Sequence, residues 1–264
     1  MKSAGFTLIE LLITISLSAF LMVGVSTMYI NYVSSYEFNQ KKKELLANAR
    51  FFGDMLAREV RFLGMSTDPL SEKYIIFPEI KGMNKCQDFS AGEFIKPLKN
   101  KVTDGVCFRA GTKNKNLENI NMPTSNSNFK ACTNEICEIY YDRVKKIVYY
   151  SDYMINMEEG KLIEARLVAK DAVIAENIEG FKVYAVTSNK DINDLSVKVI
   201  PIKDLKPTDK VVALNFLILL SEDVGSKVKN DSLNHWKEET GETIADDKNK
   251  IYEMISITEY IYNG

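Results

Sequence analysis

The sequence lacks the short motifs on which most catalytic and cofactor-binding sites are built. It contains no phosphate-binding loop, no dinucleotide-binding glycine pattern, no Gly-x-Ser-x-Gly elbow and no paired-histidine zinc helix. Its single histidine, His235, also restricts schemes that use histidine as a general base or in a catalytic triad. The chain is therefore predicted to be non-enzymatic and to bind no cofactor.

The chain also lacks an excess of positive charge. It has 34 Lys and Arg against 36 Asp and Glu, for a net charge of -2 at pH 7. Without a global basic field, specific nucleic-acid binding is not expected. The 264 residues, 45% of them hydrophobic, are enough for one membrane anchor and one globular domain with a real core. This composition excludes a disordered chain.

Proline is absent before Pro69, and charge is absent from residues 11–36. About 20 apolar residues suffice to span a bilayer, so this run fits a membrane helix. Glu10 lies at its beginning, and an ionised carboxylate in a membrane requires a cationic partner. If the chain is cut between Gly5 and Phe6, the new α-amino group of Phe6 lies one helical turn from Glu10 or faces it from a neighbouring subunit.

Two other interpretations account for an apolar run near an N-terminus. A secretory signal has its cleavage site after the apolar core, whereas the cut expected here precedes it and leaves the helix attached. An ordinary single-span anchor fits the hydropathy equally well, but it does not explain Glu10. Residues 1–5 carry Lys2 and are expected to stay on the cytoplasmic side as a short leader.

Residues 5–12, GFTLIELL, resemble the class III signal of type IV prepilins and type II secretion pseudopilins. The resemblance implies that a prepilin peptidase cleaves after Gly5 and N-methylates Phe6. It also implies that Glu10 meets the Phe6 amine of an adjacent subunit and sets axial register in a filament. The membrane run then becomes an assembly helix that remains after processing.

Beyond the uncharged run, apolar residues recur at helical spacing and form one stripe, with charged residues mostly off it. The stripe consists of Phe38, Leu45, Ala49, Phe52, Leu56, Val60 and Leu63. Gly64 supplies a stop, so we expect one helix from Phe6 to about Leu63, roughly 85 Å long at 1.5 Å per residue. The lysines at 41–43 are predicted to be a solvated face rather than a lipid-binding switch.

After Gly64 the pattern changes to β-branched and aromatic runs, several of them alternating, which predicts antiparallel strands. The runs are residues 102–109, 136–142, 146–152, 162–169, 178–187, 211–221 and 251–262. Residues 142–145 and 158–160 are predicted to be hairpin loops. The expected fold class is α+β, with a long N-terminal helical spine packed on an antiparallel sheet. The resemblance implies that this is a type IV pilin-like fold.

The predicted organisation has four parts. Residues 1–5 are the cleaved leader, residues 6–36 the transmembrane and assembly half of the helix, residues 37–64 its amphipathic half, and residues 65–264 a β-rich periplasmic head. Residues 112–130 and 225–250 are polar and are predicted to be surface excursions, the second with Trp236 as a candidate contact anchor.

Two further segments extend the resemblance. Residues 48–64 are similar to the first helix of PilW-like minor pilins and J-type pseudopilins, and residues 176–183, ENIEGFKV, look like their internal strand motif. The resemblance implies a minor pilin that initiates, primes or tips a type IV pilus and so supports adhesion, twitching motility or DNA uptake. A J-type pseudopilin of a type II secretion system is the alternative, and a single-span protein with a periplasmic binding domain is the second.

The same resemblance implies the partners and the location. The partners are prepilin peptidase, other minor pilins, the major pilin and the inner-membrane assembly platform. The chain is expected to sit first in the inner membrane of a Gram-negative bacterium with a periplasmic head. It would later be part of a pilus on the cell surface.

All four cysteines follow the apolar run, on the side expected to be oxidising. Four cysteines allow three pairings, which sequence alone does not distinguish. We favour Cys86 with Cys107 and Cys132 with Cys137, because the second pair can close a short loop. Zinc is disfavoured, since Cys132 and Cys137 are loosely spaced, no second close pair exists and His235 is distant in sequence.

The acidic clusters at residues 191–194 and 246–247 are the other candidate metal ligands. Neither has the glycine and terminal glutamate of a calcium-binding loop. They are predicted to be solvated turns, and no metal is expected.

Overall fold

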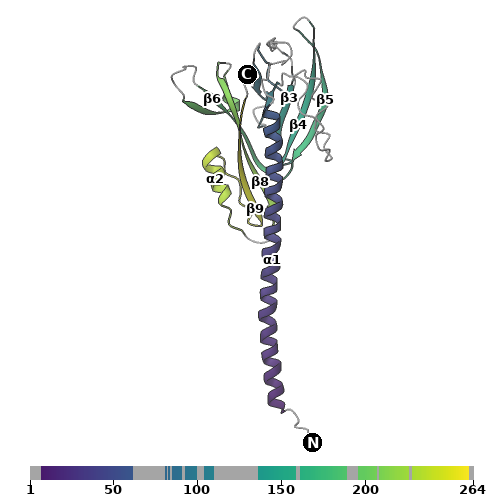
Figure 1. Cartoon of the computed structure of the whole chain (residues 1–264), viewed down its shortest axis with the longest axis vertical. Coiled ribbons are helices and arrows are strands. Elements are labelled where there is room, and N and C mark those ends of the chain that lie inside the picture. The colour runs from purple at the N-terminus through teal and green to yellow at the C-terminus, as the bar shows by residue number, and fades with distance from the viewer. Residues whose placement is uncertain are drawn as a thin grey trace.

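The computed structural model describes residues 7–61, 81, 83, 85–90, 93–99, 104–109, 136–158, 161–188, 196–206, 208–225 and 228–261. A long N-terminal helix carries two antiparallel sheets and a second, short helix (Figure 1). The elements are α1 (Leu8–Arg61), β1 (Ile95–Pro97), β2 (Gly105–Phe108), β3 (Ile136–Asp142), β4 (Ile147–Glu158), β5 (Lys161–Ala175), β6 (Ile178–Ser188), β7 (Val197–Pro201), the 3-10 helix η2 (Ile202–Asp204), β8 (Lys210–Asp223), α2 (Asp231–Thr240) and β9 (Lys250–Tyr260).

Helix α1 divides into two halves. Its first half projects from the rest of the molecule, and its second half lies against the sheets (Figure 1). By length and composition, α1 is able to cross a membrane. The predicted apolar stripe is confirmed where the structure describes it. Leu45, Ala49, Phe52, Leu56 and Val60 are buried, and Phe38 is half-buried and packs against the same core. The predicted helix start and stop, Phe6 and residues 63–64, lie outside the described residues.

The first sheet is a meander in the order β1-β2-β3-β4-β5. Its strands are consecutive in sequence, and the pairing of β4 with β5 extends to Glu158 opposite Lys161. The predicted hairpin at 142–145 is confirmed: Asp142 pairs with Ile147, and its carboxylate accepts the backbone N–H groups of Val144 and Lys145. This side-chain bonding is the mechanism by which Asp initiates turns.

The second sheet has the order β7-β6-β8-β9. Strand β8 is one of its two central strands and is buried on both faces. From Leu214 to Leu220, even-numbered residues such as Phe216 lie in the core shared with α1, and odd-numbered ones such as Leu219 pack with Trp236 of α2. The buried side chains of α1 share one core with residues of both sheets. The α+β prediction is therefore confirmed, with two sheets on the spine where a single sheet was expected.

The polar segment 225–250 is not a surface excursion throughout, and this prediction was wrong. Residues Asp231–Thr240 form α2, which ends at Gly241 in the left-handed conformation at φ 72°. Trp236 is fully buried rather than a surface contact anchor. It packs with Leu217, Leu219 and Tyr252 on the outer face of the second sheet. The polar residues that made the segment look solvated occupy the outward face of a short amphipathic helix.

The space for Trp236 comes from Gly180 on β6. A Cβ at Gly180 would collide with the indole ring, so only glycine lets the helix approach the strand this closely. The structure also contains β1 and β7, which the sequence did not predict. Both are short and end at prolines, Pro97 and Pro201, and such runs give little periodic signal.

A disulfide joins Cys86 to Cys107. This is the first of the two pairs favoured from the sequence. Cys137 is also disulfide-bonded, whereas Cys132 lies outside the described residues. The Cys86–Cys107 bridge fastens the segment before β1 to β2, and both cysteines are fully buried with Phe89 and Ile136 in a small second core.

Replacing Cys86 and Cys107 together by alanine is expected to lower the free energy of unfolding by about 3 kcal/mol. The reason is that the bridge closes a loop of sequence separation 21 and so restricts the unfolded chain. Urea denaturation of the purified protein, followed by the fluorescence of buried Trp236, measures the loss. A loss below about 1 kcal/mol would show that the small core already holds this segment without the bridge.

Candidate assembly site on the N-terminal helix

The N-terminus of α1 is capped by reciprocal hydrogen bonds between Thr7 and Glu10. The Thr7 backbone N–H and hydroxyl donate to Glu10 Oε2 at 3.0 and 2.9 Å, and the Glu10 N–H donates to Thr7 Oγ1 at 3.3 Å. The Thr7 carbonyl accepts the N–H of Leu11 at 3.2 Å, the first helical bond. This arrangement is a capping box, with threonine at the N-cap and glutamate three residues later.

The capping box gives Glu10 a local structural role that the sequence interpretation did not assign. Both Thr7 donors reach the same oxygen, Oε2, and an ionised carboxylate has about four acceptor positions. The cap therefore orients the carboxylate and leaves acceptor capacity for an incoming amine. Gly5 and Phe6 lie outside the described residues, so their cleavage, methylation and pairing with Glu10 stay predictions.

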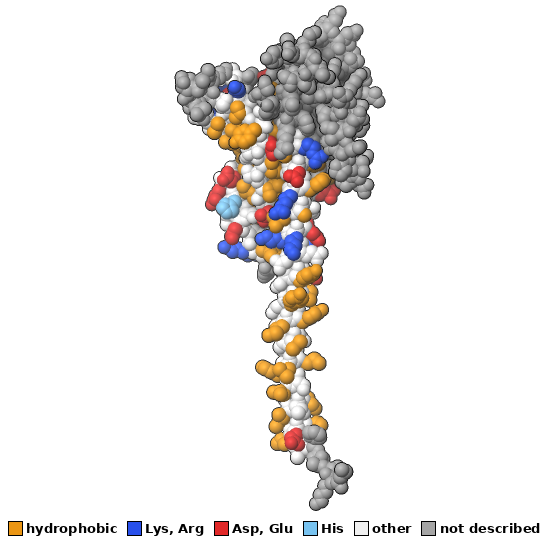
Figure 2. Space-filling model, viewed as in Figure 1, with side chains coloured by type: hydrophobic (Ala, Val, Ile, Leu, Met, Phe, Trp, Pro, Cys, Tyr) orange, Lys and Arg blue, Asp and Glu red, His pale blue; other side chains and the backbone are white. Residues whose placement is uncertain are grey.

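The projecting half of α1 exposes apolar side chains around its whole circumference. Figure 2 shows them along the projecting part of the molecule, with an acidic side chain near its tip. More than half of each of these large side chains is exposed: Leu8, Ile9, Leu11, Leu12, Ile13, Ile15, Leu17, Phe20, Leu21, Met22, Val23, Val25, Met28, Tyr29, Ile30, Tyr32 and Tyr36. A helix that is apolar all round needs lipid or other helices to cover it.

Three of the polar side chains in this apolar surface bond to their own helix. The hydroxyl of Thr14 donates to the carbonyl of Glu10, that of Ser16 to Leu12, and that of Thr27 to Val23, all at 2.8 to 2.9 Å. Internal bonding of this kind removes the penalty of placing a hydroxyl in hydrocarbon. These three hydroxyls are therefore compatible with the bilayer that α1 is long and apolar enough to cross.

Lys41 makes the first polar contact between the helix and the head. Its Nζ lies 3.1 Å from Glu222 Oε1 on β8. Lys42 and Lys43 are exposed, as the prediction of a solvated face requires. From Leu45 onward the helix is held by burial, so the projecting half ends close to Lys41.

The internal motif at residues 176–183 leads into strand β6, and side chains of the motif connect the parts of the head. Phe181 lies in the shared core, with its ring 6.4 Å from Phe52 on α1, 6.2 Å from Tyr141 on β3 and 6.2 Å from Phe216 on β8. One ring thus joins the spine to both sheets. The motif could be found from the sequence, but this role depends on contacts distant in sequence.

Glu179 and Lys182 of the same motif are centres of two ion-pair clusters across the sheets. Glu179 lies 2.7 Å from the Lys146 ammonium in the β3–β4 turn and 3.3 Å from that of Lys250 on β9. Lys182 lies 3.0 Å from Asp104 before β2 and 2.7 Å from Glu242 after α2. The two clusters fix the sheets relative to each other, which gives the helix a rigid head.

The Glu179 cluster makes the head sensitive to acid. Burial would raise the pKa of the Glu179 carboxyl, but hydrogen bonds from Lys146 and Ser221 and the charges of Lys146 and Lys250 outweigh it and lower that pKa below 4.5. A carboxyl with a lowered pKa in the folded state contributes stability above its unfolded pKa and loses it as the pH falls through the folded pKa.

We therefore expect the free energy of unfolding to fall as the pH is lowered below about 4.5, and the fall to be shallower in Glu179→Gln. The variant is also expected to be less stable than the native chain at pH 7, because Lys146 and Lys250 lose their shared anion. Urea denaturation at a series of pH values measures both effects. An unchanged pH slope in the variant would contradict the assignment of this carboxyl as the acid-sensitive group.

The buried acid Glu138 has a cation and a hydrogen-bond donor beside it in the head. Glu138 on β3 is almost fully buried, and burial raises its pKa, against the opposing charge of Lys85 and a hydrogen bond from Tyr153. Lys85 lies 3.8 Å from Glu138 and 3.2 Å from Asp171, so it bridges both carboxylates. These contacts pin the segment around Lys85 and Cys86 onto the first sheet.

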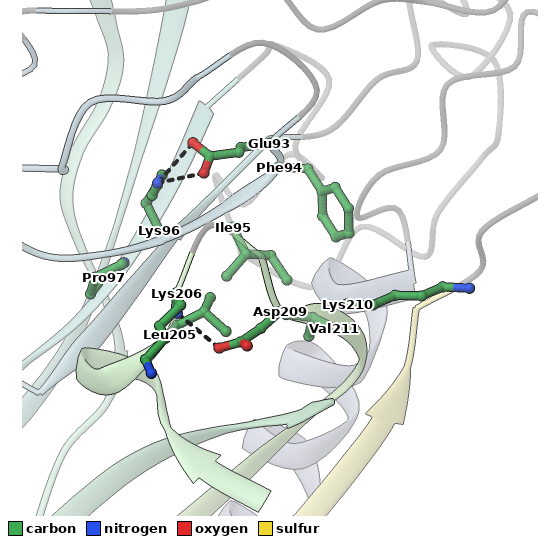
Figure 3. A pocket seen from close by; sticks show the side chains of 10 residues that line it. All are labelled: Glu93, Phe94, Ile95, Lys96, Pro97, Leu205, Lys206, Asp209, Lys210 and Val211. Carbon is green, nitrogen blue, oxygen red and sulfur yellow. Dashed lines mark hydrogen bonds and ion pairs between the residues drawn. The ribbon is translucent and has the colours of Figure 1, made fainter. Parts of the chain in front are cut away.

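An open pocket of about 240 Å³ lies where the edge of the first sheet meets the loop before β8 (Figure 3). Phe94, Leu205 and Val211 provide its apolar wall. The charged side chains are mostly paired within the wall: Lys96 lies 2.7 Å from Glu93, and the Asp209 carboxylate accepts the N–H of Lys206. The described residues that line this pocket contain no convergent set of catalytic groups.

Among the described residues, no group of three or more His, Cys, Asp or Glu side chains is placed to hold a metal ion. Of the two acidic clusters considered from the sequence, Asp246 and Asp247 lie in the connection before β9. There the carboxylate of Asp247 accepts the N–H of Asn249 and that of Asp246 a bond from Asn230. Residues 191–194 lie outside the described residues.

Comparisons with known proteins agree with the N-terminal geometry. The family model of the prokaryotic N-terminal methylation motif matches residues 1–26. No curated protein matches the chain. Among solved structures, a type IV-like pilin from Thermus thermophilus is similar, with 10% identity over 83% of this chain and 97% of that chain and a TM-score of 0.43. The methylation motif thus lies at the start of the long apolar helix α1.

Proposed function

We propose that the chain is a minor pilin, a structural subunit that initiates, primes or tips a type IV pilus. The observation that carries the proposal is the combination of the methylation motif with α1. The first half of the helix is exposed and apolar all round, whereas its second half is buried in the head. Such a helix can exchange a lipid environment for that of sister helices without any change in the head.

The proposal assigns processing to residues 5 and 6. A prepilin peptidase hydrolyses the bond after Gly5 with water, releases residues 1–5 and transfers a methyl group from a separate methyl donor to the new Phe6 amine. The amine, protonated at neutral pH, is the cation that the Glu10 carboxylate needs. Because Thr7 already orients Oε2, an amine from a neighbouring subunit can be accepted without a new backbone arrangement. Pairing of Phe6 on one subunit with Glu10 on the next would then set the axial step of the filament.

The proposed division of the chain follows the same logic. Residues 6–36 form the membrane and assembly segment, residues 37–64 attach it to the head, and the remainder is the periplasmic head. The partners are other minor pilins, the major pilin and the inner-membrane assembly platform. The size of the head favours a pilus over a J-type pseudopilin, which remains the second candidate because it shares the same N-terminal signal.

Mass spectrometry of the N-terminus tests the first part of this proposal. In cells with an active prepilin peptidase, the purified chain is expected to begin with methylated Phe6. An intact Met1 terminus would overturn the pilin proposal and favour an ordinary single-span protein. Gly5→Leu is the matched variant, expected to keep Met1 while the head stays folded, because the substitution lies far from the core.

Co-purification separates the two machines. After crosslinking in intact cells, a minor pilin should be recovered with other pilins, and loss of the major pilin should remove it from the cell surface. Recovery with secretion pseudopilins and unchanged pili after deletion of the chain would favour the J-type candidate.

A further inference from the structure

We propose that Tyr29, Tyr32 and Tyr36 form a tyrosine belt that binds the phospholipid headgroup layer on the head side of the bilayer. The proposal rests on the membrane insertion of α1 in the proposed function. It goes further by fixing the depth of the helix and hence the position of Glu10. The tyrosine belt holds the head close to the membrane surface until the chain is extracted.

The three tyrosines lie on one face of the helix and are open to the surroundings. Their spacing of three and then four residues is the spacing of neighbours on a helix surface. They are 67%, 69% and 61% exposed, respectively. Within the described part of the chain, their hydroxyls have no hydrogen bond, so the phenol groups are available to water or phosphate. Tyrosine is enriched at membrane interfaces because its ring is apolar and its tip is wet.

The belt lies one bilayer away from Glu10. The 19 residues from Glu10 to Tyr29 cover about 29 Å of helix at 1.5 Å per residue, close to the ~30 Å of a hydrocarbon core. With Tyr29 at the outer boundary, the capping box of Thr7 and Glu10 falls at the inner boundary. The acid then sits among headgroups before assembly, and it enters hydrocarbon only when the helix moves outward.

The head begins a short distance beyond the headgroup layer. From Tyr29 to Tyr36 the helix rises about 10 Å, enough to cross a headgroup layer of roughly 5–8 Å. Lys41, about 8 Å beyond Tyr36, is already bound to Glu222 of the head. Figure 2 shows Lys and Arg side chains on the lower part of the head, above the projecting helix. The charge-free run ends at Tyr36, and Glu37, Lys41, Lys42 and Lys43 follow it. Tyrosines at the boundary and charged residues beyond it are the groups expected on leaving the hydrocarbon core.

A tryptophan placed in the belt can report its depth. The belt probe, Tyr32→Trp, and the control probe, Phe20→Trp, are compared in phosphatidylcholine vesicles whose lipids carry bromine either near the headgroup or near the end of the acyl chain. Phe20 is exposed and lies about 18 Å along the helix from Tyr32, near the middle of the apolar run. Native Trp236 is buried in the head and adds the same fluorescence to every variant. This background is measured on the unmodified chain and subtracted.

The tyrosine belt predicts at least twofold stronger quenching of the belt probe by headgroup-side bromine than by deep bromine, and the reverse for the control probe. Deep quenching of the belt probe equal to that of the control probe would overturn the belt while leaving membrane insertion intact. Quenching of the control probe with none of the belt probe would mean that protein covers the tyrosine face, and would also overturn it. If neither probe is quenched, the helix is not inserted and the proposed function loses its membrane step as well.

Removing the phenols gives a second measurement. Changing Tyr29, Tyr32 and Tyr36 to leucine in the chain that carries the control probe extends the apolar run. The helix is then expected to slide, and the deep quenching of the control probe to fall by half or more. The matched change of all three to phenylalanine, which keeps the rings, is expected to have a smaller effect. Unchanged quenching of the control probe in the leucine variant would show that other residues set the depth.

Discussion

Glu10→Gln is expected to leave the chain cleaved and inserted in the membrane but to reduce its incorporation into filaments at least about tenfold. Glutamine keeps the length and the hydrogen-bonding carbonyl of the side chain while removing its charge. In the low dielectric of packed helices, removing one partner of an ion pair leaves the other, here the Phe6 amine of a neighbour, uncompensated. The fraction of the chain in sheared filaments, measured by immunoblotting against the membrane fraction, gives the effect.

The capping box makes this substitution informative. Glutamine serves as well as glutamate at the third position of a capping box, so Glu10→Gln retains the bonds with Thr7. Thr7→Val is the reciprocal variant, since it removes the hydroxyl and keeps the charge of Glu10. If charge is the decisive property, Thr7→Val has the smaller defect. If the two variants fail equally, the cap itself carries the function and Glu10 is a helix-terminus residue.

The N-terminal site was largely predictable because its chemistry is local in sequence. A single acid before an uncharged run stands out without any structure, and the glycine and phenylalanine before it have fixed spacing. The helix followed from a 3.6-residue period sustained to Val60. The capping box was also present in the sequence as Thr7 and Glu10. It was missed because Glu10 had already been assigned to an intermolecular contact.

The head was predictable in its strands and much less so in its arrangement. Strand β3 agrees with its predicted bounds, whereas β4 and β5 are longer than predicted. Several register shifts in their pairing break the alternation of side chains from which the bounds were predicted. The division into two sheets depends on which strands pair across long stretches of chain, as β6 does with β8. Helix α2 was hidden because its apolar residues are few, and Trp236 needs Gly180, distant in sequence, to be buried.

The attachment of the spine to the head rests on packing and is testable with two adjacent phenylalanines. Phe52 on α1 is 1% exposed and contacts the shared core, whereas Phe51 is 62% exposed on the other face of the same helix. Phe52→Ala is expected to lower the free energy of unfolding by about 3–5 kcal/mol, through lost transfer energy and a cavity that the two sheets cannot close. Phe51→Ala should change it by no more than about 0.5 kcal/mol.

Urea denaturation of the detergent-purified chain, followed by the fluorescence of Trp236, measures both values, because the indole is buried in the head and reports its unfolding. If Phe52→Ala is too unstable to purify, Phe52→Leu keeps most of the volume and is expected to lose about 1 kcal/mol. Equal losses for the Phe51 and Phe52 variants would show that the spine is not anchored through this face. The two substitutions are chemically identical and lie at adjacent positions of the helix. A large difference between their losses of unfolding free energy therefore comes from the face of the helix on which each residue lies. A helix held this firmly transmits the docking of Glu10 to the head as a rigid displacement, because close-packed cores transmit strain rather than absorb it.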